Sequence, residues 1–196
     1  MQELIVKAAY SERTIRVYQA YSDSIAVPAL QAGRFVPPFK MDRMTWIKPS
    51  FNWMMYRSGY ATNPGQEVVL GIDIKREGFE WALEHAALSR FHPSVHSSYD
   101  EWQKQLNEQP VRIQWDPARD WRLNVIEGAR AIQIGLSGEA VERYVSDWIV
   151  RMEDVTDVAQ RLATDMRSGT IPEALPDQSE VPYSLSPALQ LKLCRE

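Results

Sequence analysis

Residues 34–57 read RFVPPFKMDRMTWIKPSFNWMMYR, a stretch in which basic and aromatic side chains interleave. It holds five basic residues and one acidic residue, a net charge of +4, whereas the whole chain carries −4. Basic groups bind phosphates, and aromatic rings stack on bases or on a nicotinamide ring. The stretch therefore predicts a site for a compact, anionic, ring-bearing ligand. The alternative, which composition alone favours, is a half-buried strand–turn–helix corner with its aromatics in the core and its charges in water.

The length and composition of the chain are those of an ordinary globular protein. Its 196 residues and 22.6 kDa fit one domain, expected over residues 1–170, with an extended, proline-containing tail at 171–196. Hydrophobic residues make up 44% of the chain, so a sizeable core can form without disulfides. The pI near 5.5 argues against electrostatic binding of long duplex DNA, but it leaves room for a local basic site.

The single cysteine, Cys194, cannot form a disulfide within one chain, which favours a cytoplasmic protein. The first residues lack the apolar segment of a signal peptide. No part of the sequence reaches the run of about 18 apolar residues that a membrane-spanning helix needs. A cytoplasmic location without a membrane anchor is therefore expected.

Short strands and helices are expected to follow one another without a regular βαβ rhythm. Alternating side chains predict a strand at 14–21, and Ser50 is expected to cap a short helix that ends at Gly59. Ser98 is expected to cap a polar helix. Further strands are predicted at 67–74, 111–116 and 130–136. This order predicts an α+β domain with a mixed or antiparallel sheet and flanking helices.

Residues 138–154 have the most regular apolar spacing of the chain. Their large apolar side chains recur at steps of four and one, which is typical of one face of a helix. The members of this stripe are Ala140, Val141, Tyr144, Val145, Trp148, Ile149 and Met152. The spacing predicts one long helix whose apolar face covers the core.

The motifs of common nucleotide-binding folds and hydrolases are absent: the chain has no GxGxxG, P-loop, GxSxG, HExxH or CxxC sequence. His92 and His96 have a metal-ligand spacing, but Pro93 predicts a loop there, so no metal site is expected. Asp116 lies at a predicted strand end, where a carboxylate is well placed to act in catalysis. An Asp-Pro turn accounts for an aspartate at this position equally well. Gln133 interrupts an apolar strand. Its amide either points into a cleft or is hydrogen-bonded to neighbours on the face of the sheet.

Four stretches together closely resemble an uncharacterised microbial family, known as a domain of unknown function. They are RVYQAYSDSIA, RMTWIKPSFNWMMYRSG, VRIQWDPARD and RAIQIGLSGEAVERYV. The likeness covers most of the chain, from the strand at 14–21 through residues 138–154. It implies a shared fold and carries no assigned activity.

A second resemblance is to ADP-ribosyltransferases, especially those that modify nucleic acids. It rests on a strand containing Tyr18, a short helix with the pattern Leu30-x-x-Gly33, and a basic aromatic segment that begins at Arg43. The resemblance implies a split sheet and NAD as a substrate, with the acceptor on a nucleic acid or a protein. It also implies a catalytic Glu on a later strand.

The position that matches this Glu is Gln133, so the chain departs from the family there. Ribosyl transfer through an oxocarbenium-like state then lacks its usual stabilising carboxylate. Either another acid such as Asp116 or Glu139 serves, or the chemistry differs, as in the tRNA phosphotransferase branch. The third reading is that the fold only binds its ligand.

The resemblance and the residue types together define an expected NAD site. Arg16 and Arg43 are expected to hold phosphates, because arginine forks onto phosphate oxygens. Tyr18 and Trp46 would pack against the nicotinamide or the ribose, and Gln133 or Asp116 would contact the reacting ribose. The other expected binding residues are Gln19, Lys48, Ser50, Trp53, Tyr56 and Arg57. The alternative function is a non-catalytic module whose basic aromatic segment stacks on a nucleotide or single-stranded RNA.

Overall fold

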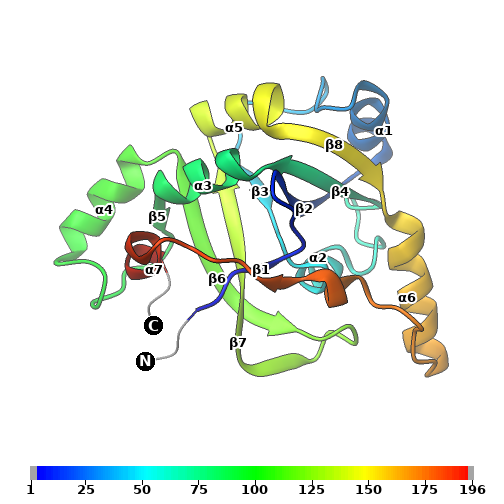
Figure 1. Ribbon diagram of the computed structural model, residues 1–196. Helices are drawn as coiled ribbons and strands as arrows, with labels where there is room; N and C mark the ends of the chain where they lie inside the picture. The colour runs from blue at the N-terminus through cyan, green and yellow to red at the C-terminus, as the bar shows by residue number, and fades with distance from the viewer. Residues whose placement is uncertain (1–3, 194–196) are drawn as a thin grey trace.

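A three-stranded sheet and a four-stranded sheet form the framework of the structure, and helices lie around them (Figure 1). The structure is a computed structural model in which residues 4–193 are described. The strands are β1 (Lys7–Ala8), β2 (Thr14–Tyr21), β3 (Thr45–Ile47), β4 (Val68–Lys75), β5 (Ala86–Leu88), β6 (Val111–Arg119), β7 (Val125–Leu136), β8 (Ile149–Asp154) and β9 (Val181–Pro182).

The helices lie between these strands and after them. They are α1 (Asp23–Ala32), α2 (Phe51–Ser58), α3 (Arg76–Glu84), α4 (Tyr99–Glu108), α5 (Glu139–Arg143), the π-helical turn η1 (Tyr144–Trp148), α6 (Thr156–Ser168), the 3-10 turn η2 (Pro176–Ser179) and α7 (Pro187–Leu193). The α+β class predicted from the sequence is confirmed. Among the described residues, no helix is long and apolar enough to cross a membrane.

The two sheets are joined at the bridge between Tyr18 and Lys48. The smaller sheet has the antiparallel order β2-β4-β8, and the larger has the order β3-β7-β6-β5, in which only β5 and β6 run parallel. The N–H of Tyr18 donates to the carbonyl of Lys48 at 2.8 Å, and the return bond measures 3.2 Å. This bridge holds the middle of the basic aromatic stretch beside β2, the first long strand.

The starts of α2 and α4, and the end of α2, follow capping residues in the sequence. The Ser50 hydroxyl accepts the N–H of Trp53 at 3.3 Å, and Gly59 ends α2 with φ +58°. The Ser98 hydroxyl likewise accepts the N–H of Glu101 at the start of α4, at 3.1 Å. A side-chain oxygen satisfies an orphan N–H at a helix start, and glycine adopts the left-handed conformation at low cost. Both predicted helices are confirmed.

The long helix predicted at 138–154 is wrong in its second half. The chain is helical only through α5 and η1, and residues 149–154 form β8. Met152 pairs with Ile72, and Asp154 pairs with Leu70, in an antiparallel ladder with β4. Without β8, β4 would present an unpaired edge of N–H and C=O groups. Pairing therefore overrides an apolar spacing that fits both structures.

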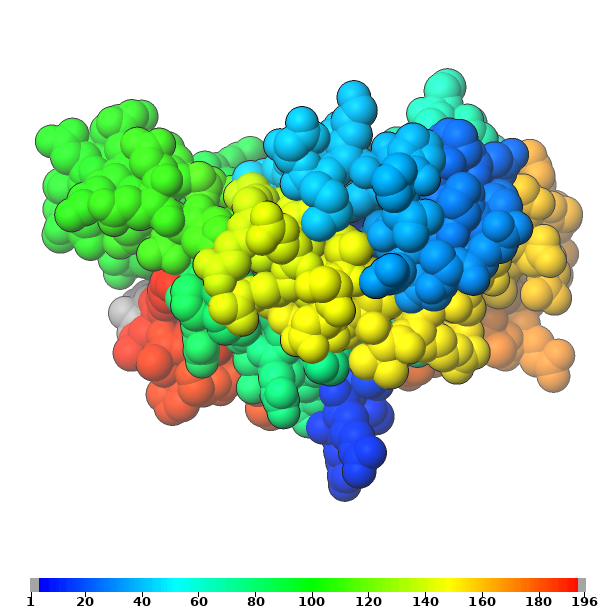
Figure 2. All heavy atoms as spheres, turned by 90° about the horizontal axis from the view of Figure 1, so that it is seen from above, coloured from blue at the N-terminus to red at the C-terminus, as the bar shows by residue number. Residues whose placement is uncertain are grey.

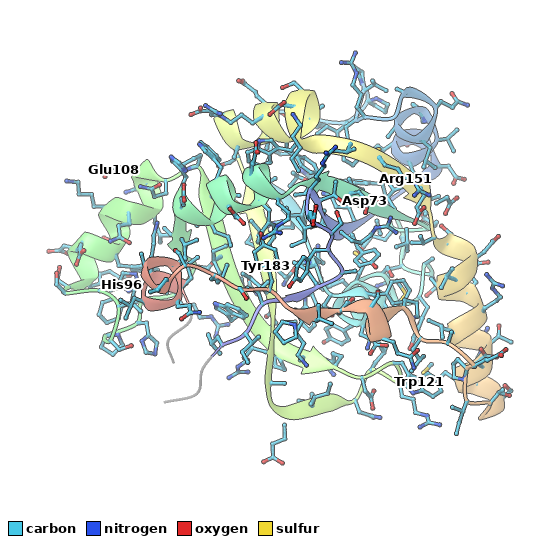
Figure 3. All side chains as sticks on the ribbon, viewed as in Figure 1. Asp73, His96, Glu108, Trp121, Arg151 and Tyr183 are labelled. Carbon is cyan, nitrogen blue, oxygen red and sulfur yellow. The ribbon has the colours of Figure 1, made fainter. Side chains whose placement is uncertain are left out.

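The segment after residue 170 crosses one face of the molecule and packs against it (Figure 3). Its strand β9 pairs with β1, and the buried Tyr183 hydroxyl accepts from Arg76 Nε at 3.0 Å and donates to Glu80. The Glu180 carboxylate accepts the N–H of Phe51 at 2.6 Å and so satisfies the first backbone N–H of α2. The sequence predicted an extended tail here and did not predict α7. Cys194 lies outside the described residues.

Candidate functional site

The basic aromatic stretch forms most of one wall of a pocket of about 470 Å³. The pocket lies where the end of β2, the segment before β3, helix α2 and the loop at 64–66 meet. In Figure 2 the segment around residue 40 lies beside α1, and the loop near residue 65 lies behind them. The lining residues are Gln19, Ala20, Tyr21, Ser22, Ile25, Pro38, Phe39, Lys40, Arg43, Met44, Thr45, Trp46, Lys48, Met54, Arg57, Pro64, Gly65 and Gln66.

The charges of this lining all have one sign. Lys40, Arg43 and Arg57 are exposed cations, Lys48 is a buried one, and no lining residue is acidic. A concave surface with a single sign of charge concentrates ligands of the opposite sign. The aromatic rings of the lining belong to Tyr21, Phe39 and Trp46. The pocket therefore suits an anion attached to a flat or apolar group.

Lys48 is the unusual member of the lining, because its side chain is buried with only 7% exposed. Its Nζ donates to the carbonyl of Trp46 at 3.1 Å, and it takes part in none of the ion pairs of the described residues. Burial, followed by the positive charge of Arg57, lowers the pKa of Lys48 to about 7, against the opposing effect of the Asp116 carboxylate. Lys48 therefore loses its proton far more readily than an ordinary lysine.

A hydrogen-bond network at the base of the pocket fixes Gln19. The hydroxyl of Tyr144 donates to Gln19 Oε1 at 2.7 Å, and Gln19 Nε2 donates to Thr45 Oγ1 at 2.6 Å and to the Tyr21 hydroxyl at 2.9 Å. The last two hydroxyls are themselves 2.8 Å apart. Gln19 therefore positions two hydroxyl groups in the pocket wall.

We expect Tyr144→Phe to lower the free energy of unfolding by about 1–2 kcal/mol, because it leaves the buried Gln19 Oε1 without its donor. Urea denaturation measures this loss. Tyr10→Phe is the matched control, since the hydroxyl of the exposed Tyr10 has a single hydrogen-bond partner within residues 4–193, the Pro182 carbonyl at 3.2 Å. Equal small losses in the two variants would contradict a role for the Gln19 network in stability.

The pocket brings together five of the binding residues expected from the sequence. These are Gln19, Arg43, Trp46, Lys48 and Arg57. Lys40, Tyr21 and Thr45 also line the pocket, and sequence reasoning did not select them. Lys40 lay within the basic stretch, so its charge was the available signal. The positions of Tyr21 and Thr45 depend on how the two sheets meet, which no local pattern reveals.

Arg16 lies outside this lining and has carboxylate partners instead. Its Nε and Nη2 donate to Asp73 at 2.6 and 2.7 Å, and its Nη1 donates to Glu153. Asp73 and Arg151, which pairs with Glu153 at 2.6 Å, occupy opposing positions of β4 and β8 (Figure 3). The hydrogen bonding of Arg16 to Asp73 is the main cause that raises the pKa of Arg16. The expected phosphate-binding side chain is thus engaged in a part-buried ion-pair cluster.

Four other expected site residues are likewise not among the lining residues. Tyr18 packs edge-on against Phe51, with ring centroids 5.3 Å apart, and the Ser50 hydroxyl caps α2. Trp53 is 4.9 Å from the ring of Tyr56, whose other neighbour is the guanidinium of Arg119 at 3.9 Å. Within the stretch, Phe51 and Trp53 are buried in a packed corner, as the alternative interpretation expected, whereas Tyr56 is exposed.

Gln133 and Asp116 contact each other on neighbouring strands. Gln133 Nε2 donates to Asp116 Oδ2 at 2.5 Å, and Gln114 Nε2 donates to Asp116 Oδ1 at 2.9 Å. Neither Gln133 nor Asp116 lines the pocket, but the charge of Asp116 acts on Lys48. A Glu at position 133 would bring two carboxylates into contact, which is unfavourable. The amide therefore matches the neighbouring carboxylate.

Comparison with known families places the chain. The family described as "Domain of unknown function (DUF4291)" matches residues 5–183, and the chain therefore belongs to this family. Comparison with curated proteins found no match. Among the described residues, no group of three or more His, Cys, Asp or Glu side chains could hold a metal ion.

Proposed function

We propose that this member of the DUF4291 family binds a phosphate-bearing nucleotide, with NAD as the first candidate, in the pocket beside β3. The observation that carries the proposal is the set of four cations, Lys40, Arg43, Lys48 and Arg57, in a lining without an acidic residue. The pocket volume of about 470 Å³ is within the range of small-molecule sites.

The chemistry of the lining supports a pyrophosphate more than a simple carboxylate. Arg43 and Arg57 are exposed, and each can donate two parallel N–H bonds to phosphate oxygens. Trp46 offers a ring on which a base or a nicotinamide can stack. The Tyr21 and Thr45 hydroxyls supply neutral hydrogen-bonding groups for a ribose.

ADP-ribosyl transfer is the activity that we propose for the bound NAD. In this reaction nicotinamide leaves the ribose C1 with the bonding electrons, and an acceptor nucleophile, on a nucleic acid or a protein, takes its place. This proposal is supported by the bridge between Tyr18 and Lys48, which sets β2 beside the basic aromatic stretch. Asp116, held by two amides, is the carboxylate whose charge acts on the pocket through Lys48.

A non-catalytic nucleotide- or single-stranded-RNA-binding module is the second candidate. Two observations favour it. The Arg16 guanidinium is engaged by Asp73 and Glu153. The position that matches the catalytic Glu of ADP-ribosyltransferases holds Gln133, which donates to Asp116. This candidate requires the same cationic pocket and predicts binding without release of nicotinamide. Turnover therefore separates the two functions.

We expect NAD and ADP-ribose to raise the melting temperature of the wild-type protein, because a ligand that binds only the folded state stabilises it. Arg43→Ala should weaken the affinity by about tenfold or more, since a charge-assisted hydrogen bond contributes roughly 1.5–3 kcal/mol. Thermal-shift and calorimetric titrations measure both effects.

Arg34→Ala is the matched control, because Arg34 is exposed in the same stretch and does not line the pocket. If NAD, ADP-ribose and a short RNA at millimolar concentration neither raise the melting temperature of the wild-type protein nor release heat on titration, the proposed pocket function is refuted. Stabilisation by RNA alone would favour the RNA-binding module. If NAD binds but no nicotinamide is released in the presence of RNA and protein acceptors, the proposal of NAD binding stands and the proposal of ADP-ribosyl transfer is rejected.

A further inference from the structure

We propose that Lys48 supplies a nucleophilic amine that forms an imine with a phosphate-bearing carbonyl compound held in the cationic pocket. The inference deepens the proposed function, because it uses the same anion site and names a reactive group within it. It requires that the pocket hold a phosphate, and it does not require that the ligand be NAD.

The geometry separates Lys48 from the other cations of the lining. Lys40, Arg43 and Arg57 are exposed and can hold a phosphate at the mouth, whereas Lys48 is 7% exposed in the wall. Among the described residues, the single hydrogen-bond partner of its side-chain Nζ is the Trp46 carbonyl, at 3.1 Å. A carbonyl oxygen does not supply the charge that keeps a buried ammonium protonated.

The surroundings of Lys48 favour the neutral amine, which is the nucleophilic form. A lysine becomes reactive when it is desolvated or lies near another cation. Both conditions are met, because burial is the first cause and the charge of Arg57 on α2 the second cause of a pKa of about 7. Asp116 on β6 acts in the opposite direction but is not within ion-pair distance. A substantial fraction of the amine is then neutral at pH 7.

The proposed step is balanced without an oxidant or a reductant. The amine lone pair attacks the carbonyl carbon, a carbinolamine forms, and the former carbonyl oxygen leaves as water while the carbon–nitrogen double bond forms. The exposed arginines hold the phosphate and so raise the effective concentration of the carbonyl near the amine. ADP-ribose belongs to this chemical class, because the open-chain form of its terminal ribose carries an aldehyde.

Reductive trapping with pyridoxal 5′-phosphate and borohydride, followed by peptide mass spectrometry, tests the inference. We expect Lys48 to be modified before the exposed lysines, and pyridoxal without its phosphate to modify it at least about tenfold less, because it lacks the charge-assisted anchor. Lys192 is the internal control. Burial lowers its pKa as well, but it donates to the Glu84 carbonyl outside the pocket.

The pH dependence of trapping is a readout that a purely structural lysine would not give. In Arg57→Gln the pH midpoint for modification of Lys48 should move upward, because a neighbouring positive charge is removed. Arg34→Gln should leave the midpoint unchanged. Modification of exposed lysines with Lys48 unmodified, or equal modification by the two aldehydes, would overturn the inference.

The trapping experiment and the NAD titration fail independently. Selective modification of Lys48 together with no NAD stabilisation would reject the NAD-binding proposal and keep the reactive amine. Stabilisation by NAD with no modification of Lys48 would reject the reactive amine and keep the NAD-binding proposal.

Discussion

Lys48→Met is expected to raise the free energy of unfolding at pH 7 by a few kcal/mol. A buried lysine that lacks a carboxylate partner destabilises the folded state, because the ammonium is desolvated without compensation. Methionine has a similar length and no charge, so it can occupy the same space. A substitution in a candidate binding site would then stabilise the protein while removing the proposed amine, a known form of the conflict between stability and function.

The size of this effect should depend on pH in a defined direction. The unfolded chain keeps a proton on Lys48 up to pH 10.5, whereas the folded chain releases it above pH 7. Between these values the unfolded state binds more protons, so the contribution of Lys48 to stability improves as pH rises and worsens as pH falls toward 7. The slope is at most about 1.4 kcal/mol per pH unit, and the whole interval amounts to no more than about 5 kcal/mol.

Urea denaturation at pH 7 and pH 9 measures this difference. The wild-type protein should gain stability from this residue between the two pH values, and Lys48→Met should lack that gain. Lys104→Met is the control, because Lys104 is exposed on α4 and its Nζ is 3.8 Å from Glu108. A Lys48→Met variant that is less stable than wild type by the same amount at both pH values would show that Lys48 is not a desolvated, unpaired amine.

The candidate site could be predicted from the sequence where charge density carried the signal. The basic aromatic stretch supplies all four cations of the pocket, and the short connection at 48–50 between β3 and α2 keeps Lys48 and Arg57 in the same lining. Cations that are close in sequence are often close after folding, although Arg34 of the same stretch does not line the pocket.

The residues selected outside this stretch depended on strand pairing, which the sequence does not display. Arg16 and Gln19 lie on one strand and looked equivalent. Arg16 meets Asp73 and Glu153, which are distant in sequence, whereas Gln19 meets Tyr144 and lines the pocket. The carboxylate partners of an arginine decide whether it is available to a phosphate, and they lie on β4 and β8.

The fold shows the same limit at residues 138–154. An apolar spacing of four and one fits a helix, yet the first half is helical and the second half is the edge strand β8. Tyr144 and Trp148 are buried from the helical half, and Met152 packs on the core from the strand. Both halves pack large residues of the stripe against the core, fully buried in the helical half and partly buried in the strand, so the pattern alone could not distinguish the two structures.

Gly78→Ala is expected to lower the free energy of unfolding by about 3 kcal/mol, the upper part of the usual range for overpacking. A Cβ at position 78 would lie 2.5 Å from Trp148 Cδ1 and 2.6 Å from Trp148 Cδ2, closer than side-chain carbons approach. Trp148 is 3% exposed, with the ring of Trp81 5.5 Å away, so it has little room to shift.

The sign of this effect makes the test decisive, because helix propensity alone predicts that alanine stabilises α3 by up to about 1 kcal/mol. Chemical denaturation should therefore show a loss where an isolated helix would show a gain. In a Trp148→Leu background the space beside position 78 opens, and the same Gly78→Ala change should become neutral or stabilising. If alanine cost the same in both backgrounds, the contact between α3 and the end of η1 could not be what requires glycine. A cost that disappears with the indole ring would instead fix Trp148 at the junction where the helix gives way to β8.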